Sequence, residues 1–180
     1  AFEQFKTNRL IVANRLAAQR GIDLSDPANI DQYGFPVGYS RTNQEVLIPS
    51  FLAAYSGRDV SKQKNGFMRD IPLPNWNLRY TGLTKLGWFK NNFNRITISH
   101  SYVSGYSVNN YQTNYEYLEN PDLLNAGGNY PSQNVVSNIT MTEAFSPLIR
   151  VDFLTKSGID FGLGLSKDRL LSMSFDNNLL

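Results

Sequence analysis

Apolar and polar residues alternate along the C-terminal part of the chain, which is the pattern of β-strands with two unlike faces. Between residues 138 and 153 the apolar positions are Ile139, Met141, Phe145, Ile149, Val151 and Phe153. A turn is predicted at 156–158, where the sequence reads Lys-Ser-Gly. Beyond it the alternation resumes at Ile159, Phe161, Leu163 and Leu165. We therefore predict a hairpin of long strands whose apolar side chains share one face.

The second half of this hairpin carries two basic residues at apolar positions, Lys167 and Arg169. If this face meets lipid, each cation costs about 2–4 kcal/mol at the bilayer midplane. Segment 166–169 is then either a stretch of strand at a membrane–water interface or a turn between two strands. We favour a single long strand that leaves the membrane at these residues.

An earlier region, 95–117, predicts another long strand. The apolar residues at its even-numbered positions, which share one face of a strand, are Ile96, Ile98, Tyr102, Tyr106 and Val108. Beyond Asn110 the aromatic parity changes to Tyr111, Tyr115 and Tyr117, which indicates a bulge or bend near 105–110. Residues 76–80 also alternate, with Trp76, Leu78 and Tyr80 on one side, and predict a further strand.

Helical spacing predicts a helix at 2–20 and a short helix at 84–93. The apolar segment at 46–55, with Pro49 near its start and Gly57 near its end, predicts a further short helix. The helix at 46–55 is apolar all round and must be covered on every side. We predict loops at 21–44, 62–70 and 118–133, and an extended segment at 71–75, where two prolines disfavour helix. The chain thus divides into a helical and loop insertion region at 1–74 and a strand region at 75–180.

Composition narrows the class of protein. Of 180 residues, 41% are apolar, 13% aromatic and only 18% charged, with a formal net charge of +2 and a mean hydropathy of -0.35. The low charge and many aromatic residues exclude a disordered chain, and a balance near neutrality gives no electrostatic footprint for nucleic acid. The absence of Cys excludes disulfide scaffolds and thiolate chemistry.

Candidate catalytic groups are few. His100 is the only histidine, and we interpret it as a hydrogen-bonded structural residue. The carboxylate pairs Glu116 with Glu119 and Glu143 with Asp152 could serve glycoside hydrolysis, but they are better explained as surface or loop acids. Asp23, Asp26 and Asp31 lack calcium-loop spacing and are assigned to turns. We predict no enzyme, no cofactor and no metal site.

Glycines 162 and 164 lie between apolar residues of the last strand. They lack the following helix that a phosphate-binding loop needs. Small residues on one face of a strand let a neighbouring segment or ring lie close, and in a barrel that face would be the lumen.

An uncharged, polar and aromatic chain with long alternating strands fits a transmembrane β-barrel or an extracellular β-sandwich. We predict an all-β dominated fold, namely a transmembrane antiparallel β-barrel segment of a very large barrel with short helical insertions. The candidate lipid-facing residues are Ile96, Ile98, Tyr102, Tyr106, Val108, Ile139, Met141, Ile149, Val151, Phe153, Ile159, Phe161 and Leu163. The candidate interface aromatics and bases are Trp76, Trp88, Phe89, Lys167 and Arg169, of types that gather at membrane–water boundaries.

Several longer segments resemble the SprA/Sov family, the outer-membrane translocon of the type IX secretion system of Bacteroidetes. In family order they are residues 2–16 (FEQFKTNRLIVANRL), 46–57 (VLIPSFLAAYSG), 71–86 (IPLPNWNLRYTGLTKL), 96–102 (ITISHSY), 106–108 (YSV), 143–148 (EAFSPL) and 166–169 (SKDR) followed by Leu171. Together they span nearly the whole chain. Since members of this family are far longer, we expect the chain to match a segment of their C-terminal part.

The resemblance implies a conduit in the bacterial outer membrane that exports folded proteins, including adhesins and gliding-motility proteins. It implies as partners the remaining segments of the same barrel, a PorV-type shuttle barrel, a periplasmic plug protein, cargo with C-terminal signals and outer-membrane lipid. Two alternatives stay open. One is a TonB-dependent transporter or porin fragment, and the other is a secreted β-sandwich that binds carbohydrate.

Overall fold

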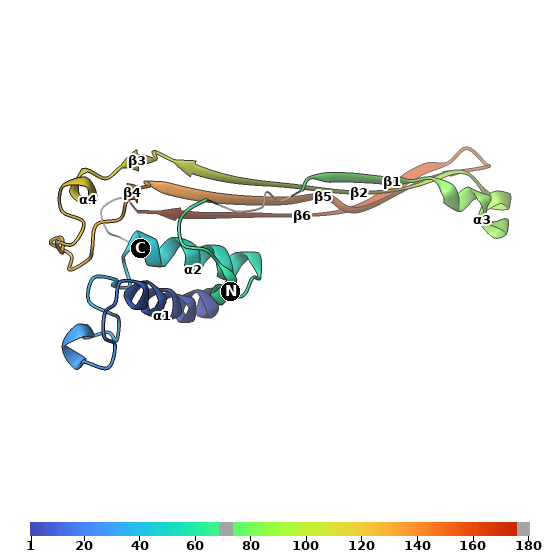
Figure 1. Cartoon of the computed structure of the whole chain (residues 1–180). Coiled ribbons are helices and arrows are strands. Elements are labelled where there is room, and N and C mark those ends of the chain that lie inside the picture. Colours follow the sequence, from blue (N-terminus) through green and yellow to red (C-terminus); the bar gives the residue numbers. More distant parts are fainter. Residues whose placement is uncertain (69–73, 176–180) are drawn as a thin grey trace. The chain divides into compact units, whose positions relative to one another are not determined.

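The computed structural model describes residues 1–68 and 74–175, so most of the predicted extended segment at 71–75 lies outside the described residues (Figure 1). The chain forms two compact units. The first, which we call the helical unit, comprises Ala1–Arg69, Val108–Asn138 and Ser174–Leu180. The second, which we call the sheet unit, comprises Asp70–Ser107 and Ile139–Met173.

Two helices dominate the helical unit and confirm the predicted helices at 2–20 and 46–55. Helix α1 is Phe2–Gln19, and Gly21 follows with a φ of 80° that favours glycine. Helix α2 is Gln44–Ser56. Its N-cap Asn43 accepts a hydrogen bond from the Glu45 backbone at 2.8 Å, and Gly57 ends it in the left-handed conformation.

The core of the helical unit joins these helices to the loops that follow them. From α1 come Val12, Ala13, Leu16 and Ala17, and from α2 come Val46 and Ala53. Phe5 of α1 and Phe51 of α2 add an edge-to-face ring pair with centroids 6.4 Å apart. All residues of 46–54 are buried, as the apolar pattern of this helix requires.

The loops of the helical unit contain two 3-10 turns, η1 (Pro27–Asn29) and η2 (Val60–Lys62). Asp26 and Asp59 start them by accepting backbone hydrogen bonds. Asp23 accepts two hydrogen bonds from Ser25, and Asp31 accepts from two backbone amides. The assignment of the predicted acidic residues to turns is therefore confirmed.

The strand predicted to reach Tyr117 is too long. Strand β2 ends at Asn109, and Asn110 adopts a left-handed φ of 54°, so the bend predicted near 105–110 is confirmed at its C-terminal end. A two-residue strand β3 (Gln112–Thr113) pairs instead with β4 (Asn134–Val135), and between them lies the short helix α4 (Tyr115–Glu119). Asn114 caps α4 by accepting from the Glu116 amide at 3.1 Å, so the chain turns away from the sheet here.

The sheet unit contains a four-stranded sheet with the strand order β1-β2-β5-β6 (Figure 1). They are β1 (Trp76–Tyr80), β2 (Phe93–Asn109), β5 (Asn138–Thr155) and β6 (Asp160–Ser174). Strands β1 and β2 are antiparallel, with Trp76 opposite Tyr102 and Tyr80 opposite Ile98. The predicted helix at 84–93 is present as two short pieces, η3 (Gly82–Lys85) and α3 (Gly87–Asn92).

The predicted hairpin of β5 and β6 is confirmed. Gly158 in its turn has a φ of 89°, which suits glycine at no steric cost. Strand β6 runs without interruption through 166–169, so the alternative of a turn at these residues is wrong and the single long strand is confirmed.

The fold is mixed α/β with an open four-stranded antiparallel sheet, and the expectation of an all-β dominated chain is corrected by α1 and α2. Helix α1 forms because 2–19 places its apolar residues at helical rather than alternating spacing, whereas α2 is a continuous apolar segment capped by Asn43 and ended by Gly57. Within the described residues, no helix combines the length and apolar character needed to span a membrane.

Candidate functional site

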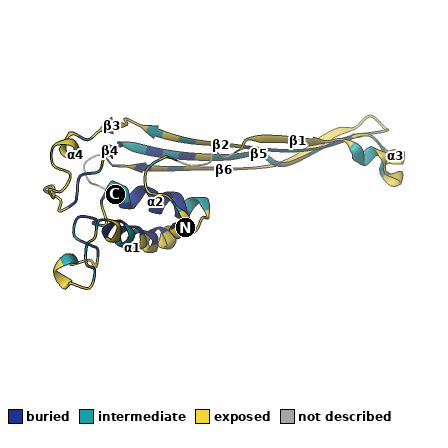
Figure 2. Ribbon diagram, in the orientation of Figure 1, coloured by how far each residue is buried: buried dark blue, intermediate teal, exposed yellow. Residues whose placement is uncertain are grey.

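One face of the sheet unit exposes large apolar side chains along β6. Phe161, Leu163 and Leu165 of β6 and Ile159, which directly precedes this strand, project from the same side, with exposed fractions of 44%, 69%, 57% and 61%. Residues 159–170 are all exposed (Figure 2). We call this side of the sheet the apolar face.

The other predicted lipid-facing residues vary in burial. Ile149 is exposed, whereas Ile98, Tyr106, Val108, Val151 and Phe153 are half-buried. The structure buries Ile96, Tyr102, Ile139 and Met141. Tyr102 is covered because the Trp76 ring stacks on it and Phe145 lies beside it, so the exposed part of the apolar face is centred on β6.

Aromatic rings gather where β5 and β6 meet in the hairpin. Phe153 stacks on Phe161 with centroids 4.9 Å apart and contacts Phe93 at 5.7 Å. Phe93 in turn contacts Trp88 and Phe89 of α3. The predicted interface aromatics of α3, Trp88 and Phe89, therefore belong to one continuous cluster of rings. Trp88 is 68% exposed.

A second cluster lies farther along the same strands and contains the other predicted interface residues. Trp76 stacks on Tyr102 at 4.4 Å, and Tyr102 contacts Phe145 at 4.7 Å. The Tyr102 hydroxyl donates to Glu143 at 3.2 Å, and Arg169 forms an ion pair with the same carboxylate. Phe145, Glu143, Lys167 and Arg169 line a cavity of about 260 Å³. We call Trp76, Tyr102, Glu143, Phe145, Lys167 and Arg169 the Trp76 cluster.

The spacing between the two clusters is set by β6. The stretch from Ile159 to Lys167 comprises nine residues, and at about 3.3 Å per residue it runs roughly 26 Å along the strand. A transmembrane strand is tilted and needs about 9–11 residues to cross the apolar band, which aromatic girdles flank. The exposed apolar stretch of β6 therefore has about the number of residues of such a strand, with aromatic residues near both of its ends.

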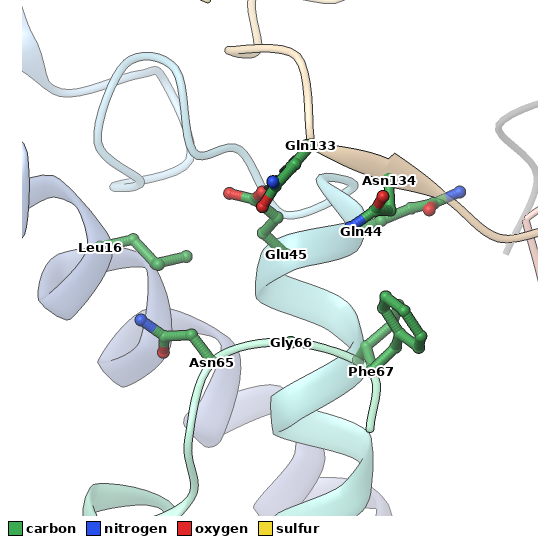
Figure 3. Close-up of a pocket in the computed structure, with 9 residues that line it drawn as sticks. Leu16, Gln44, Glu45, Asn65, Gly66, Phe67, Gln133 and Asn134 are labelled. Carbon is green, nitrogen blue, oxygen red and sulfur yellow. Dashed lines mark hydrogen bonds between the residues drawn. The ribbon is translucent and has the colours of Figure 1, made fainter. Parts of the chain in front are cut away.

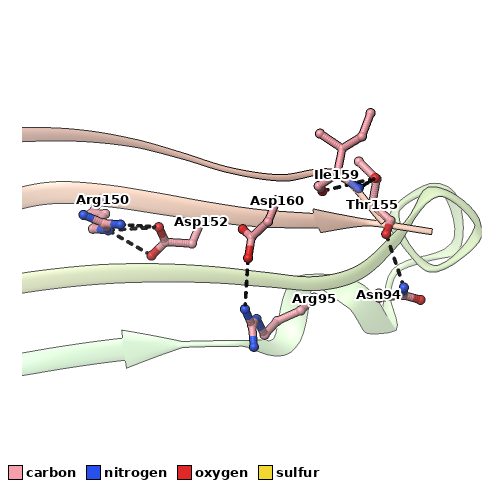
Figure 4. A network of polar contacts seen from close by, with 7 residues as sticks. All are labelled: Asn94, Arg95, Arg150, Asp152, Thr155, Ile159 and Asp160. Atoms are coloured by element: carbon pink, nitrogen blue, oxygen red, sulfur yellow. Dashed lines mark hydrogen bonds and ion pairs between the residues drawn. The ribbon is translucent and has the colours of Figure 1, made fainter. Parts of the chain in front are cut away.

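The opposite face of these strands carries charged side chains and glycines. Arg150 holds Asp152 through Nε at 2.9 and 3.0 Å and through Nη2 at 2.8 Å. Arg95 approaches Asp160 at 3.7 Å, and Asn94 donates to the Thr155 carbonyl at 3.2 Å (Figure 4). We call this side of the sheet the polar face.

Gly162 makes room for these charges. A Cβ atom on Gly162 would lie 3.3 Å from Arg150 Nη2 and closer still to Asp152, whereas one on Gly164 would lie 3.7 Å from Arg150 Cγ, at ordinary contact distance. The prediction of a close approach is confirmed for Gly162 and not for Gly164. The neighbour is a guanidinium–carboxylate pair, and a larger residue at 162 would displace it.

Glu116 and Glu119 both lie on the short helix α4 and are exposed, as expected of surface acids. The other residues considered for catalysis are not brought together. His100 Nδ1 lies 2.6 Å from the Leu148 carbonyl oxygen, so the hydrogen bond predicted for this residue is present. Glu143 and Asp152 are of opposite parity on β5 and bind different arginines. Across the described parts of the chain, 1–68 and 74–175, no group of three or more His, Asp or Glu residues is placed to hold a metal ion.

The helical unit has a cavity of about 290 Å³ that sequence patterns did not reveal (Figure 3). Leu16 and Ile48 provide apolar walls, Phe67 and Asn134 lie on another side, and Glu45 is its carboxylate. Burial raises the pKa of Glu45. The backbone amide of Gln133, which donates to the Glu45 carboxylate at 3.4 Å, and the positive charge of Arg20 lower this pKa and so oppose the effect of burial. The lining comes from four segments distant in sequence, so no local motif marks it.

No protein-family model matches this chain, and no curated protein matches it.

Proposed function

We propose that the sheet unit is a segment of the wall of a transmembrane β-barrel. The observation that carries this proposal is the contrast between the two faces of β6 over the same residues. Ile159, Phe161, Leu163 and Leu165 are exposed on one face, while Asp160 and the glycines beside the Arg150–Asp152 pair occupy the other. Barrel strands alternate in this way between lipid and a polar interior.

Ile159, Phe161, Leu163 and Leu165 are 44–69% exposed. Complete burial of one such side chain contributes about 1.5–3 kcal/mol, so the exposed parts of all four forgo roughly 3–7 kcal/mol in water. That sum is a large part of the stability of a typical domain, about 5–15 kcal/mol. Lipid contact would recover it without covering the polar face.

The outermost strands of the described sheet support the same proposal. Strands β1 and β6 each pair on one side within the described residues. In lipid every backbone donor and acceptor must be satisfied, which only closure into a barrel achieves for strands. Further strands must therefore flank β1 and β6.

Within this class, we propose that the barrel is the outer-membrane translocon of a type IX secretion system. The support is the resemblance of the seven segments, which fall on both helices and on the strands of the sheet. A very wide barrel suits the export of folded proteins, and the polar face would line its lumen. The barrel then needs no catalytic group, because direction comes from the shuttle barrel, the plug and the C-terminal signals of the cargo.

In-cell photo-crosslinking tests this function. A photoreactive amino acid at Ser166, on the polar face, should capture exported proteins that carry C-terminal signals. The same amino acid at Leu163, on the apolar face, should capture lipid instead and serves as the matched control. Capture of cargo at neither position, together with undiminished export when the gene is deleted, contradicts the translocon proposal.

A further inference from the structure

Two cations of the Trp76 cluster end the exposed apolar stretch of β6. Lys167 and Arg169 share the parity of Leu163 and Leu165, so they lie on the apolar face. Both line the cavity of about 260 Å³, together with Glu143 and Phe145. A basic group in apolar surroundings raises the free energy of the folded state unless an anion or water contacts it.

Charge in this cavity is only partly balanced. Arg169 pairs with Glu143, whose side chain is 18% exposed and which also accepts from the Tyr102 hydroxyl. Lys167 has no ion-pair partner among the residues that the structure describes. Two cations and one carboxylate leave a net charge of +1, which matches the single negative charge of a phosphodiester.

The surroundings define what kind of phosphate fits. The rings of Phe145, Tyr102 and Trp76 flank the cations on one side, and the exposed leucines of β6 lead away from them along the strand. A guanidinium and an ammonium bind phosphate oxygens through charge-assisted hydrogen bonds. Aromatic rings and aliphatic side chains suit the glycerol and acyl portion of a lipid.

We propose that Lys167 and Arg169 bind the phosphate of an anionic lipid headgroup where the apolar band of the sheet ends. This proposal rests on the proposed barrel function, because it requires the apolar face to lie in a bilayer. Glu143 holds the Arg169 guanidinium in place, with the Tyr102 hydroxyl fixing the carboxylate. Lys167 supplies the uncompensated charge that selects an anionic over a zwitterionic lipid.

The test uses the intact membrane protein in detergent, with the dissociation constant for added lipid followed by native mass spectrometry. Phosphatidylglycerol should bind more tightly than phosphatidylcholine. Lys167→Gln should weaken phosphatidylglycerol binding about tenfold, as expected for losing one charge-assisted hydrogen bond. Glu143→Gln should tighten it, because the net charge of the cavity rises from +1 to +2 while the glutamine oxygen can still accept a hydrogen bond from Arg169 and hold it in place. Lys156→Gln, in the hairpin turn at the far end of the strands, is the matched control and should leave binding unchanged.

Three outcomes overturn the lipid proposal. Equal binding of the two lipids removes its basis in charge. Equal loss of binding in the Lys156 and Lys167 variants removes its location. Inorganic phosphate that competes as well as the lipid shows that the site recognises free phosphate. Membrane fractionation separates this failure from that of the barrel itself, because a protein recovered in the aqueous fraction contradicts the proposed function and the lipid site together.

Discussion

Leu163→Arg gives the sharpest mutational test of the apolar face. Leu163 is 69% exposed and lies four residues from Ile159 and four from Lys167, or roughly 13 Å from each at about 3.3 Å per residue. It is therefore at the middle of the apolar stretch. An arginine at the midplane of a barrel's lipid face costs about 2–4 kcal/mol, which lowers the folded-to-unfolded ratio about 30- to 700-fold.

The contrast with an aqueous surface makes this test decisive. A substitution at an exposed position of a water-soluble sheet usually changes stability by no more than about 0.5 kcal/mol. The matched control is Ser166→Arg, which puts the same side chain on the polar face of the same strand. Guanidinium unfolding from phosphatidylcholine vesicles, followed by tryptophan fluorescence, measures both variants. Equal small effects of Leu163→Arg and Ser166→Arg would refute the assignment of one face to lipid.

Three further predictions concern the helical unit and are measured by urea unfolding of the full chain with far-UV circular dichroism. Glu45→Gln should stabilise the protein near pH 7 and have no effect near pH 4, because the raised pKa of Glu45 means that its ionised form is disfavoured in the folded state. A stabilisation that persists near pH 4 contradicts this reasoning. Asn43→Ala should lower the free energy of unfolding by about 1–2 kcal/mol, because α2 loses its N-cap. An unchanged urea midpoint would show that this cap does not stabilise the protein. Leu47→Ala should cost about 2–5 kcal/mol, since Leu47 is 2% exposed, whereas Leu10→Ala, at a position 40% exposed, should cost far less.

The sign of the Glu45 effect follows from linkage. A carboxyl whose folded pKa lies above its unfolded value stabilises the protein most below the unfolded pKa, here 4.5. This contribution is lost as the pH rises through the folded pKa. Glutamine mimics the protonated form at every pH, and its side-chain oxygen can still accept from the Gln133 amide.

The long strands were predictable because alternation is a local signal. Ile159 to Leu165 show it without interruption, and the Gly158 turn marks where it begins. The pattern also persisted through Lys167 and Arg169, and the strand persists there too. What alternation could not supply is the pairing order, because strand neighbours depend on contacts between distant residues.

A bend was predicted near 105–110, where β2 ends, but the strand was continued to Tyr117 because tyrosines follow the bend. Tyr111 and Tyr115 favour strands by propensity, yet Asn110 adopts a left-handed conformation that asparagine tolerates. A usable signal was present at Asn114, an N-cap residue followed by Glu116 in the first turn of α4. Local capping overrode the aromatic pattern.

The polar sites needed the tertiary structure. The Arg150–Asp152 pair explains Gly162 only once β6 is placed beside β5. The bridge from Tyr102 through Glu143 to Arg169 joins three strands. No sequence spacing encodes such a link, because each partner sits on a different strand of the sheet.

A single-cysteine scan of residues 159–166, in the intact protein reconstituted into lipid vesicles, tests the lipid assignment of β6 most directly. Residues 1–180 contain no Cys, so each nitroxide label reports one site once any cysteines outside this segment have been replaced. Accessibility to oxygen, which concentrates in lipid, should peak at 159, 161, 163 and 165. Accessibility to a water-soluble nickel complex should peak at 160, 162, 164 and 166. Nickel accessibility at both sets of positions would contradict the claim that β6 separates lipid from a polar interior.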